Sequence, residues 1–314
     1  MMRFLTLSLL ALLASSFLSA QDNWQSRLYT PTHVEKLGDT YFIVVCFQHR
    51  ILYSDDLSLP IEEWKLLDDT IAGPHSIDSD GEVFVAEDTG RHGLHVYREG
   101  EDGELSRVQT LGPFGKRTHR VRYDEATKAF YVISSNSQDM TKLIRDRDGV
   151  KVAYTKPLPV LENSYTRSMT IIGDAMYFTS GPGVITKVRY RDDSYAPLAT
   201  YRVPEGMESA NDVFRTSDGW WYVTSTPQRI VRARSLEELD EGNWEDVFET
   251  LGMNGTPYYL EEFDGRIFVP EITQYSALTS FVHGPEGEIT DVKTHFDFGP
   301  PNDSDKERVQ AFPR

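Results

Sequence analysis

The feature that most constrains this chain is a long sequence repeat that runs through nearly all of it. Each unit opens with a polar residue, continues through a short run to a tight turn, and ends in a strand rich in aromatic and β-branched residues. Successive units start 42, 44, 48, 44 and 47 residues apart, at His33, His75, His119, Arg167, Asn211 and Tyr258. Six units of about 40 to 50 residues are typical of a β-propeller, in which each unit forms a four-stranded antiparallel blade.

The interior of each unit fits this interpretation. Asp-Gly pairs at 80–81, 218–219 and 264–265 predict hairpin turns, because glycine adopts the positive φ that such turns need. Apolar runs at 94–97 and 230–233 predict third strands. We therefore expect an all-β, six-bladed β-propeller that forms a single domain over residues 21–314, with blades starting near residues 32, 74, 118, 166, 210 and 257. Residues 24–29 are expected to add an edge strand to the last blade and so to close the ring.

The first twenty residues have the pattern of an export signal. Arg3 precedes an apolar run over residues 4–13, and small residues ending at Ala20 precede a polar segment. This run is shorter than the roughly 18 residues that a membrane-spanning helix needs, and no later segment reaches that length. We expect residues 1–20 to be a cleaved signal peptide, with a retained N-terminal anchor as the alternative. The protein is therefore expected to be secreted or periplasmic, without a membrane span.

Charge and cysteine content exclude several classes of protein. The formal net charge is −17 at pH 7, whereas nucleic-acid binding needs a basic surface, so no nucleic-acid partner is expected. The acidity helps to keep an exported protein soluble and still leaves room for a local basic pocket. The single cysteine, Cys46, lies in a strand-like run and excludes a disulfide framework, so we expect it to be a small core residue. We expect a monomer.

Two units resemble blades of known propeller families. Residues 73–91, GPHSIDSDGEVFVAEDTGR, followed by LHVY at 94–97, resemble an NHL repeat. Residues 210–224, which begin ANDV and end DGWWYVT, are similar to a blade of the SMP-30/gluconolactonase and arylesterase-like propellers. The resemblance covers most of the chain as a blade pattern, and it implies the fold rather than one activity, because propellers host many chemistries.

The gluconolactonase resemblance also implies a ligand set for a divalent cation, usually calcium or zinc. It assigns Asn211 to that set, together with an early Glu and a later axial Asp. In this sequence blade one begins Thr32-His33 and blade six begins Pro257-Tyr258, so both acidic positions are missing. The resemblance therefore does not extend to the lactonase or arylesterase mechanism.

Propeller geometry places the starts of the units around one mouth of the central channel. His33, His75 and His119 then hold equivalent positions in three consecutive blades. Imidazole is a common metal ligand, so these three residues are candidate ligands of a divalent metal such as Zn, Mn or Ca. The resemblance adds that some axial propeller lyases hold a metal through several such histidines. The alternative is that each histidine hydrogen-bonds the backbone of a neighbouring blade. No organic cofactor is expected.

The same mouth is predicted to hold three catalytic residues, Arg167, Tyr258 and His119. Arginine binds a carboxylate or sulfate through its planar fork, and a tyrosine or histidine beside it can act as acid or base. Alternatively, Arg167 pairs with Glu162 or Glu208 and Tyr258 only packs. Strand alternation places either Tyr258 or Tyr259 on the axis, but not both.

These residues together predict an exported, metal-assisted lyase or hydrolase that acts on a carbohydrate or another small polar substrate. The sequence lacks a Gly-x-Ser-x-Gly elbow, a His-Glu-x-x-His motif and a phosphate-binding glycine-rich loop. The alternative is a non-catalytic propeller that binds a glycan, a peptide or a protein, which would need a flat or aromatic patch instead of a polar pocket. Loops that reach the mouth supply the candidate substrate-binding residues His49, Arg91, Gln138, Asn211, Arg229, Gln274 and Tyr275.

Overall fold

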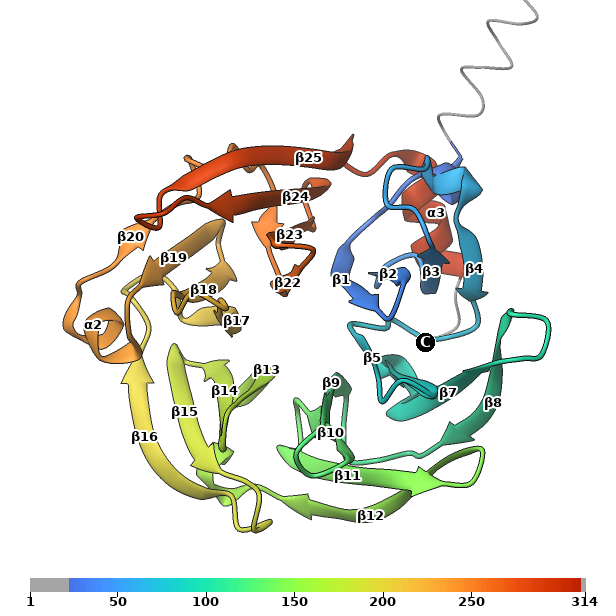
Figure 1. Ribbon diagram of the computed structural model, residues 1–314, viewed down its shortest axis with the longest axis horizontal. Helices are drawn as coiled ribbons and strands as arrows, with labels where there is room; N and C mark the ends of the chain where they lie inside the picture. The colour runs from blue at the N-terminus through green and yellow to red at the C-terminus, as the bar shows by residue number, and fades with distance from the viewer. Residues whose placement is uncertain (1–22, 312–314) are drawn as a thin grey trace, which may run out of the picture.

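The strands form six antiparallel sheets arranged as blades around a central axis (Figure 1). The computed structural model describes residues 23–311, so the expected signal peptide, residues 1–20, lies outside the described residues. Within each sheet the strands follow the order of the chain, as in a meander. The prediction of an all-β, six-bladed propeller is confirmed. None of the helices described is long and apolar enough to cross a bilayer.

The first three blades follow one another along the chain. Blade 1 contains β1 (Pro31–Leu37), β2 (Thr40–Val45), β3 (Arg50–Ser54) and β4 (Lys65–Asp68). Blade 2 contains β5 (Ile77–Ser79), β6 (Val83–Asp88), β7 (Gly93–Glu99) and β8 (Leu105–Leu111). Blade 3 contains β9 (Thr118–Asp124), β10 (Ala129–Ser134), β11 (Asp139–Asp146) and β12 (Gly149–Pro157).

The last three blades complete the ring. Blade 4 contains β13 (Tyr165–Ile172), β14 (Ala175–Gly181), β15 (Val184–Arg189) and β16 (Ala196–Arg202). Blade 5 contains β17 (Ser209–Arg215), β18 (Trp221–Thr226), β19 (Arg229–Ala233) and β20 (Glu245–Asp246). Blade 6 has an interrupted inner strand, β21 (Thr256–Pro257) and β22 (Glu261–Phe263), followed by β23 (Arg266–Ile272), β24 (Ser276–His283) and β25 (Ile289–Gly299). The helical segments are α2 (Leu236–Glu241), α3 (Asp303–Ala311), η1 (Trp24–Ser26), η2 (Ile61–Glu63), η3 (Thr89–Arg91) and η4 (Pro159–Leu161).

The hydrophobic core is divided into wedges between neighbouring blades. Six main clusters of buried apolar residues each join strands of two adjacent blades. The second strands are buried along most of their length because other blades cover both of their faces, as at residues 42–45 of β2 and along all of β10. This two-sided burial explains why these strands are continuously apolar in the sequence instead of alternating.

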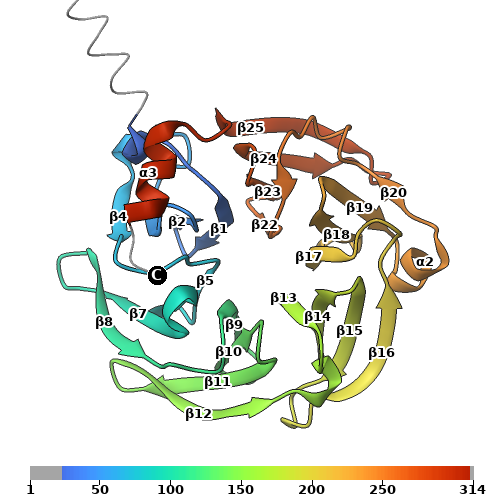
Figure 2. The same cartoon turned by 180° about the vertical axis from the view of Figure 1, so that it is seen from behind.

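The ring closes without an exchanged strand, so the expected edge strand at residues 24–29 is wrong. Residues Trp24–Ser26 form the short 3-10 turn η1, and β25 stays the outermost strand of blade 6. Blades 1 and 6 already hold complete meanders, and their seam is an apolar cluster that includes Leu28, Trp64 and Phe296. Figure 2 shows α3 lying against blade 1 beside this seam, where Asp305 pairs with Arg27 at 3.1 Å.

A β-bulge sets which side chains face the mouth of the channel. The strand register shifts at Thr32, His119, Arg167 and Asn211 in the inner strands of blades 1, 3, 4 and 5. A bulge of this kind re-aims a side chain. In every blade a buried apolar residue follows two positions after the mouth residue, which extends the alignment to all six blades. These apolar residues are Val34, Ile77, Val121, Met169, Val213 and Leu260. The mouth layer is therefore Thr32, His75, His119, Arg167, Asn211 and Tyr258.

The predicted equivalence of His33 with His75 and His119 is wrong by one residue. Thr32 holds the mouth position of blade 1, and His33 belongs to the next layer down the channel, in line with Ser76 and Arg120. Residues of this second layer connect neighbouring blades. The backbone N–H of Ile77 donates to His33 Nδ1 at 3.4 Å, and the N–H of Val121 donates to Ser76 Oγ at 2.9 Å.

The blade 1–blade 6 seam gives the first prediction. We expect Leu28→Ala to lower the free energy of unfolding by about 2–5 kcal/mol, because Leu28 is 1% exposed and its removal leaves a cavity in the seam. The control, Leu66→Ala, changes a side chain that is 51% exposed and should alter stability by no more than about 0.5 kcal/mol. Urea unfolding followed by tryptophan fluorescence measures both values. An equal decrease in the free energy of unfolding in the two variants would contradict the role of Leu28 in closing the ring.

Candidate functional site

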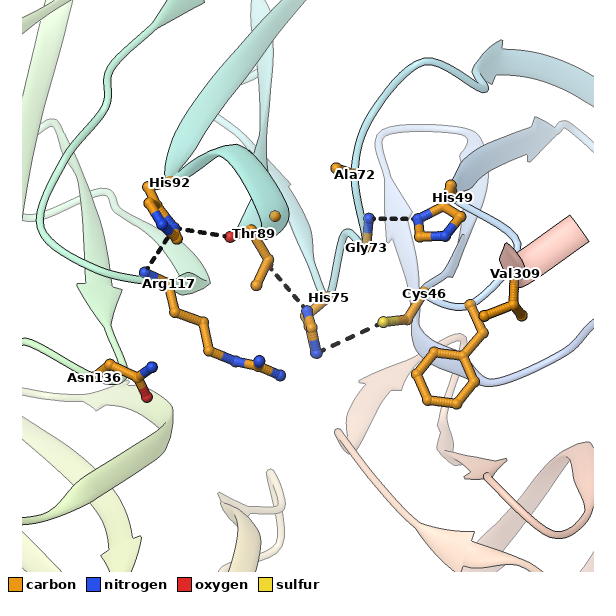
Figure 3. Close-up of a pocket in the computed structure, with 12 residues that line it drawn as sticks. Cys46, His49, Ala72, Gly73, His75, Thr89, His92, Arg117, Asn136 and Val309 are labelled. Carbon is orange, nitrogen blue, oxygen red and sulfur yellow. Dashed lines mark hydrogen bonds between the residues drawn. The ribbon is translucent and has the colours of Figure 1, made fainter. Parts of the chain in front are cut away.

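Two connected cavities lie at the mouth of the channel. The larger, about 380 Å³, extends over blades 1 to 3, and the smaller, about 150 Å³, lies over the axis. They share Cys46, Phe47, His75 and Arg117. Figure 3 shows His49, His75, His92 and Arg117 around the larger cavity. The predicted catalytic residues His119, Arg167 and Tyr258 all line the smaller one.

His75 and His119 stack against each other with ring centroids 4.0 Å apart. His119 Nδ1 lies 2.8 Å from the Tyr259 hydroxyl and also 2.8 Å from the main-chain oxygen of Arg167, which can only accept a hydrogen bond. Nδ1 therefore carries the proton, and Nε2 keeps a lone pair. The hydroxyl of Tyr259 donates to the same Arg167 oxygen at 2.7 Å and so helps to fix this arrangement.

Both stacked histidines are neutral at physiological pH. Burial, reinforced by the Arg117 charge, lowers the pKa of His75 to about 3. Burial and the neighbouring His75 hold the pKa of His119 well below its usual value. His75 Nε2 lies 3.7 Å from the sulfur of Cys46, whose pKa burial raises to about 12, so this contact joins a neutral imidazole to a neutral thiol. Cys46 is buried as predicted, but it forms part of the cavity wall.

Arg167 faces the smaller cavity from blade 4. It donates to Asn211 Oδ1 at 2.5 Å, and the Asn211 amide donates to the main-chain oxygen of Pro257 at 2.9 Å. Asn211, predicted to bind substrate, therefore positions Arg167. The alternative pairing of Arg167 with Glu162 or Glu208 does not occur within residues 23–311.

Tyr258 and Tyr259 both face the axis, so the expected alternation does not hold here. Residues 258–260 connect β21 to β22 and are not part of a strand. Tyr258 lines the smaller cavity, whereas the Tyr259 ring lies beneath Arg120, 3.8 Å from its guanidinium carbon. Burial raises the pKa of Tyr258 above its usual value, so its hydroxyl remains protonated at neutral pH.

Of the loop residues predicted to bind substrate, His49 lines the larger cavity, with Nδ1 accepting from the Gly73 N–H at 2.9 Å. The structure does not bring the other loop residues to either cavity. Their polar groups contact other parts of the blades: Arg91 contacts Asp88, Gln138 the main chain of Ser135 and Ser164, Arg229 Asp246, Gln274 Thr256, and Tyr275 Asp297.

Among the cavity residues that the sequence does not single out are Thr30, Arg117 and Tyr165. Each lies two positions before the mouth residue of its blade, so an alignment extended two residues upstream would have found them. Arg117 and Tyr165 contribute a cation and an aromatic face to the site. The Cζ atoms of Arg117 and Arg167 lie 5.8 and 5.5 Å from the centroid of the Tyr165 ring.

A second cluster lies deeper in the channel and contains His33. His33 Nε2 lies 2.7 Å from Glu261 and 3.1 Å from Glu35. In the described part of the chain these three residues form the one group of metal-ligating side chains whose ligand atoms lie within 4.8 Å of one another. The predicted set of His33, His75 and His119 does not form such a group, because His33 is one layer further down.

The His33 cluster does not fit a divalent cation. Arg120 donates to Glu261 at 2.8 Å, Arg122 also binds Glu261, and Arg122 approaches Glu35 at 3.3 Å. Although burial opposes it, the Arg122 and His33 contacts hold the pKa of Glu261 below its usual range. One oxygen of each carboxylate, Oε1 of Glu261 and Oε2 of Glu35, is thus already used by a guanidinium group, and a cation here would be repelled by both arginines. This cluster is a buried ion-pair network that joins blades 1, 3 and 6.

Among known proteins, no family model matches this chain, and no curated protein matches its sequence. Several solved structures are similar: the periplasmic gluconolactonase PpgL of Pseudomonas aeruginosa has a TM-score of 0.60 at 15% identity, with 87% of each chain covered. Streptogramin B lyase has a TM-score of 0.59 at 14% identity, covering 86% of this chain and 84% of that one. A Lactobacillus plantarum protein has a TM-score of 0.58 at 12% identity, with 85% of each chain covered. At these identities the likeness shows the β-propeller fold.

The charge balance of the His33 cluster predicts how the protein behaves toward metals. We expect purified protein, incubated with Zn²⁺, Mn²⁺ or Ca²⁺ and then dialysed, to retain no stoichiometric metal by elemental mass spectrometry. Treatment with a chelator should leave its melting temperature unchanged. One equivalent of metal that disappears in a folded His33→Gln variant would contradict this. Metal lost only in His75→Gln or His119→Gln would place an ion at the mouth instead.

The lowered pKa of His75 predicts a pH dependence of stability. Between about pH 6.5 and 3 the unfolded chain binds this proton and the folded protein does not, so the free energy of unfolding falls as the pH falls. One such group changes the free energy of unfolding by at most about 1.4 kcal/mol per pH unit. We expect the stability of wild type relative to His75→Gln to decrease on acidification from about pH 7 to 5, measured by urea unfolding. A difference that does not change with pH would show that His75 is not buried as a neutral group.

Proposed function

We propose that this protein is an exported enzyme of the hydrolase or lyase kind that converts a small polar substrate by acid–base chemistry at the mouth of the channel. The observation that carries the proposal is the state of His119. Its imidazole is neutral and fixed in one tautomer by the Arg167 carbonyl, and it lines a cavity that also contains the Arg167 side chain and Tyr258.

His119 is suited to accept a proton through Nε2. In a hydrolysis the proton would come from water, leaving hydroxide to attack the substrate; in an elimination it would come from the carbon beside an acidic group. Burial and the surrounding cations disfavour the imidazolium that forms, so the proton must be passed on quickly. The protonated hydroxyl of Tyr258, in the same cavity, is the corresponding acid for the leaving oxygen.

Arg167 would stabilise negative charge that develops on a substrate oxygen. Its guanidinium group is held by Asn211 and lies beside Tyr165, so it is oriented before the substrate binds. A preorganised cation in a partly water-excluded site is an effective form of transition-state stabilisation. These steps need no metal, the three histidines do not converge, and the Glu35 and Glu261 carboxylates beside His33 are paired with arginines.

The shape of the surface favours an enzyme over a docking module. The mouth is concave and contains titratable groups, as catalysis requires. Six large apolar side chains are exposed among residues 23–311. Phe47 lines the mouth, and the other five are dispersed over the outer strands of five different blades: Leu66, Val108, Val152, Leu198 and Val292. The fold is also shared with a gluconolactonase and a lyase, so it is compatible with chemistry of these kinds.

Export is part of this proposal and rests on the sequence of residues 1–20, which lies outside the described residues. N-terminal sequencing of protein recovered from the periplasm or medium of a bacterial host would test it. A mature chain starting near Gln21 is the expected result, and a cytosolic product with an intact N-terminus would contradict it.

The catalytic role of His119 is tested with a substrate panel of lactones, esters and uronate-containing oligosaccharides, followed by proton release and by the absorbance of a new double bond. On any substrate that is turned over, His119→Gln should lower kcat by about 10²–10⁴-fold, because the proton acceptor is lost. The control His283→Gln changes a histidine that contacts Tyr222 and Asp218 in the outer part of blades 5 and 6.

The outcomes of this experiment are distinct. Equal activity of His119→Gln and wild type would remove His119 from the mechanism. Absence of turnover on the whole panel would favour the non-catalytic alternative. Because the pKa of His119 lies well below its usual value, activity should also show no loss on acidification through about pH 6.5, where an ordinary histidine would become protonated.

A further inference from the structure

The charge at the channel mouth is opposite to that of the protein as a whole. The chain has 49 acidic and 32 basic residues, yet no Asp or Glu lines either mouth cavity. The cationic residues of the two linings are Arg117 and Arg167. Neither forms an ion pair with a carboxylate anywhere in residues 23–311. The surrounding histidines His75 and His119 are neutral and do not repel an anion.

Two hydrogen-bond donors at this mouth also lack partners. Arg117 Nε is buried and makes no hydrogen bond within the part of the chain that the structure describes, and the same is true of Thr30 Oγ1. Both residues line the smaller cavity. Buried polar groups are nearly always satisfied, so each of these two groups indicates an absent hydrogen-bond partner. An arginine Nε–H can only donate, which requires the partner to be an acceptor.

The backbone at both donors is held in an unfavourable conformation. Thr30 has φ 61° and Arg117 has φ 65°, in the left-handed region that non-glycine residues, and β-branched ones above all, rarely adopt. The equivalent residue of blade 2 is Gly73, with φ 59°, for which this conformation costs little. A left-handed threonine and arginine at the cavity wall are thus retained in spite of a conformational cost. Such outliers are concentrated at ligand-binding sites.

We propose that the mouth recognises a small molecule through an oxyanion group, which binds between Arg117 and Arg167 and accepts a hydrogen bond from Thr30. The chemistry shared by the candidate ligands is a carboxylate, sulfate or phosphate on a compact polar body. This inference deepens the proposed function, on which it rests: an acid group held at Arg167 would bring the neighbouring atoms of the substrate to His119, whose Nδ1 contacts the Arg167 carbonyl. Binding of the anion does not itself require turnover.

Packing alone does not account for Arg117. Its guanidinium group lies near the face of Tyr165, which satisfies no N–H group, because a cation–π contact leaves the edge of the guanidinium free to donate. Arg98 offers a contrast on the surface of blade 2. Its side chain is 41% exposed and pairs with Asp148 at 2.5 Å, so it is a suitable control for removing one arginine charge from the protein.

The test is isothermal titration calorimetry with D-galacturonate, a sugar phosphate and inorganic sulfate. D-galacturonate is compared with its neutral methyl ester and the sugar phosphate with the unphosphorylated sugar, while sulfate is titrated alone. We expect at least one anion to bind and its neutral analogue to bind about tenfold or more weakly, with affinity that falls as salt is added. Arg117→Gln should lower the affinity for the anion by a similar factor, and Arg98→Gln should leave that affinity unchanged. Preference among the three anions identifies the acid group.

Three results would overturn the inference: no anion binds, neutral analogues bind as tightly as the anions, or folded Arg117→Gln binds like wild type. If Arg117→Gln does not fold, Thr30→Val removes the second donor while leaving the charge in place, and unchanged anion affinity in that variant would count equally against the proposal. The two proposals fail separately. Anion binding without turnover on any substrate would contradict the enzyme, whereas turnover of neutral substrates with no preference for anions would contradict the oxyanion site.

Discussion

The buried carboxylate of Glu261 is the interaction on which the closed ring most depends. It belongs to blade 6 and binds His33 of blade 1 at 2.7 Å and Arg120 of blade 3 at 2.8 Å, with Arg122 as a further partner. A carboxylate removed from water is tolerated only when it is paired this completely. Since blades 1 and 6 exchange no strand, this network and the apolar seam at Leu28 hold the two ends of the chain together.

The channel therefore has two layers with different electrostatic character. In the deeper layer the buried acids Glu35, Asp78 and Glu261 lie against Arg120 and Arg122, so the charged groups there pair with one another and serve the assembly of the blades. At the mouth the arginines have no carboxylate partner in residues 23–311, and the stacked imidazoles of His75 and His119 are neutral. The β-bulge at the start of the inner strands separates these layers, because it lets two consecutive residues, such as His119 and Arg120, both turn toward the axis.

Part of the site could be predicted because its residues occur at blade starts. His119, Arg167 and Tyr258 lie at the mouth as their repeat positions indicated. The layer of His33 is not predictable from the histidine alone, because Thr32 and His33 are adjacent and only the register of the apolar Val34 distinguishes them. Arg117 was missed because its contribution depends on a left-handed backbone, and arginine, unlike glycine, carries no sequence signal for that conformation.

The sequence by itself determined the number of blades, their order and the face on which polar residues gather, because the spacing of turns and apolar strands is a local property of the chain. The tertiary structure decided which of those polar residues are neutralised. Glu35 and Arg122 are 87 residues apart, and Arg120 and Glu261 are 141 apart, so only the closed ring brings these charges into contact. In the same closed ring, Arg117 and Arg167 have no carboxylate partner among residues 23–311. Charge compensation is a long-range property, and it separates the functional mouth from the structural interior of the channel.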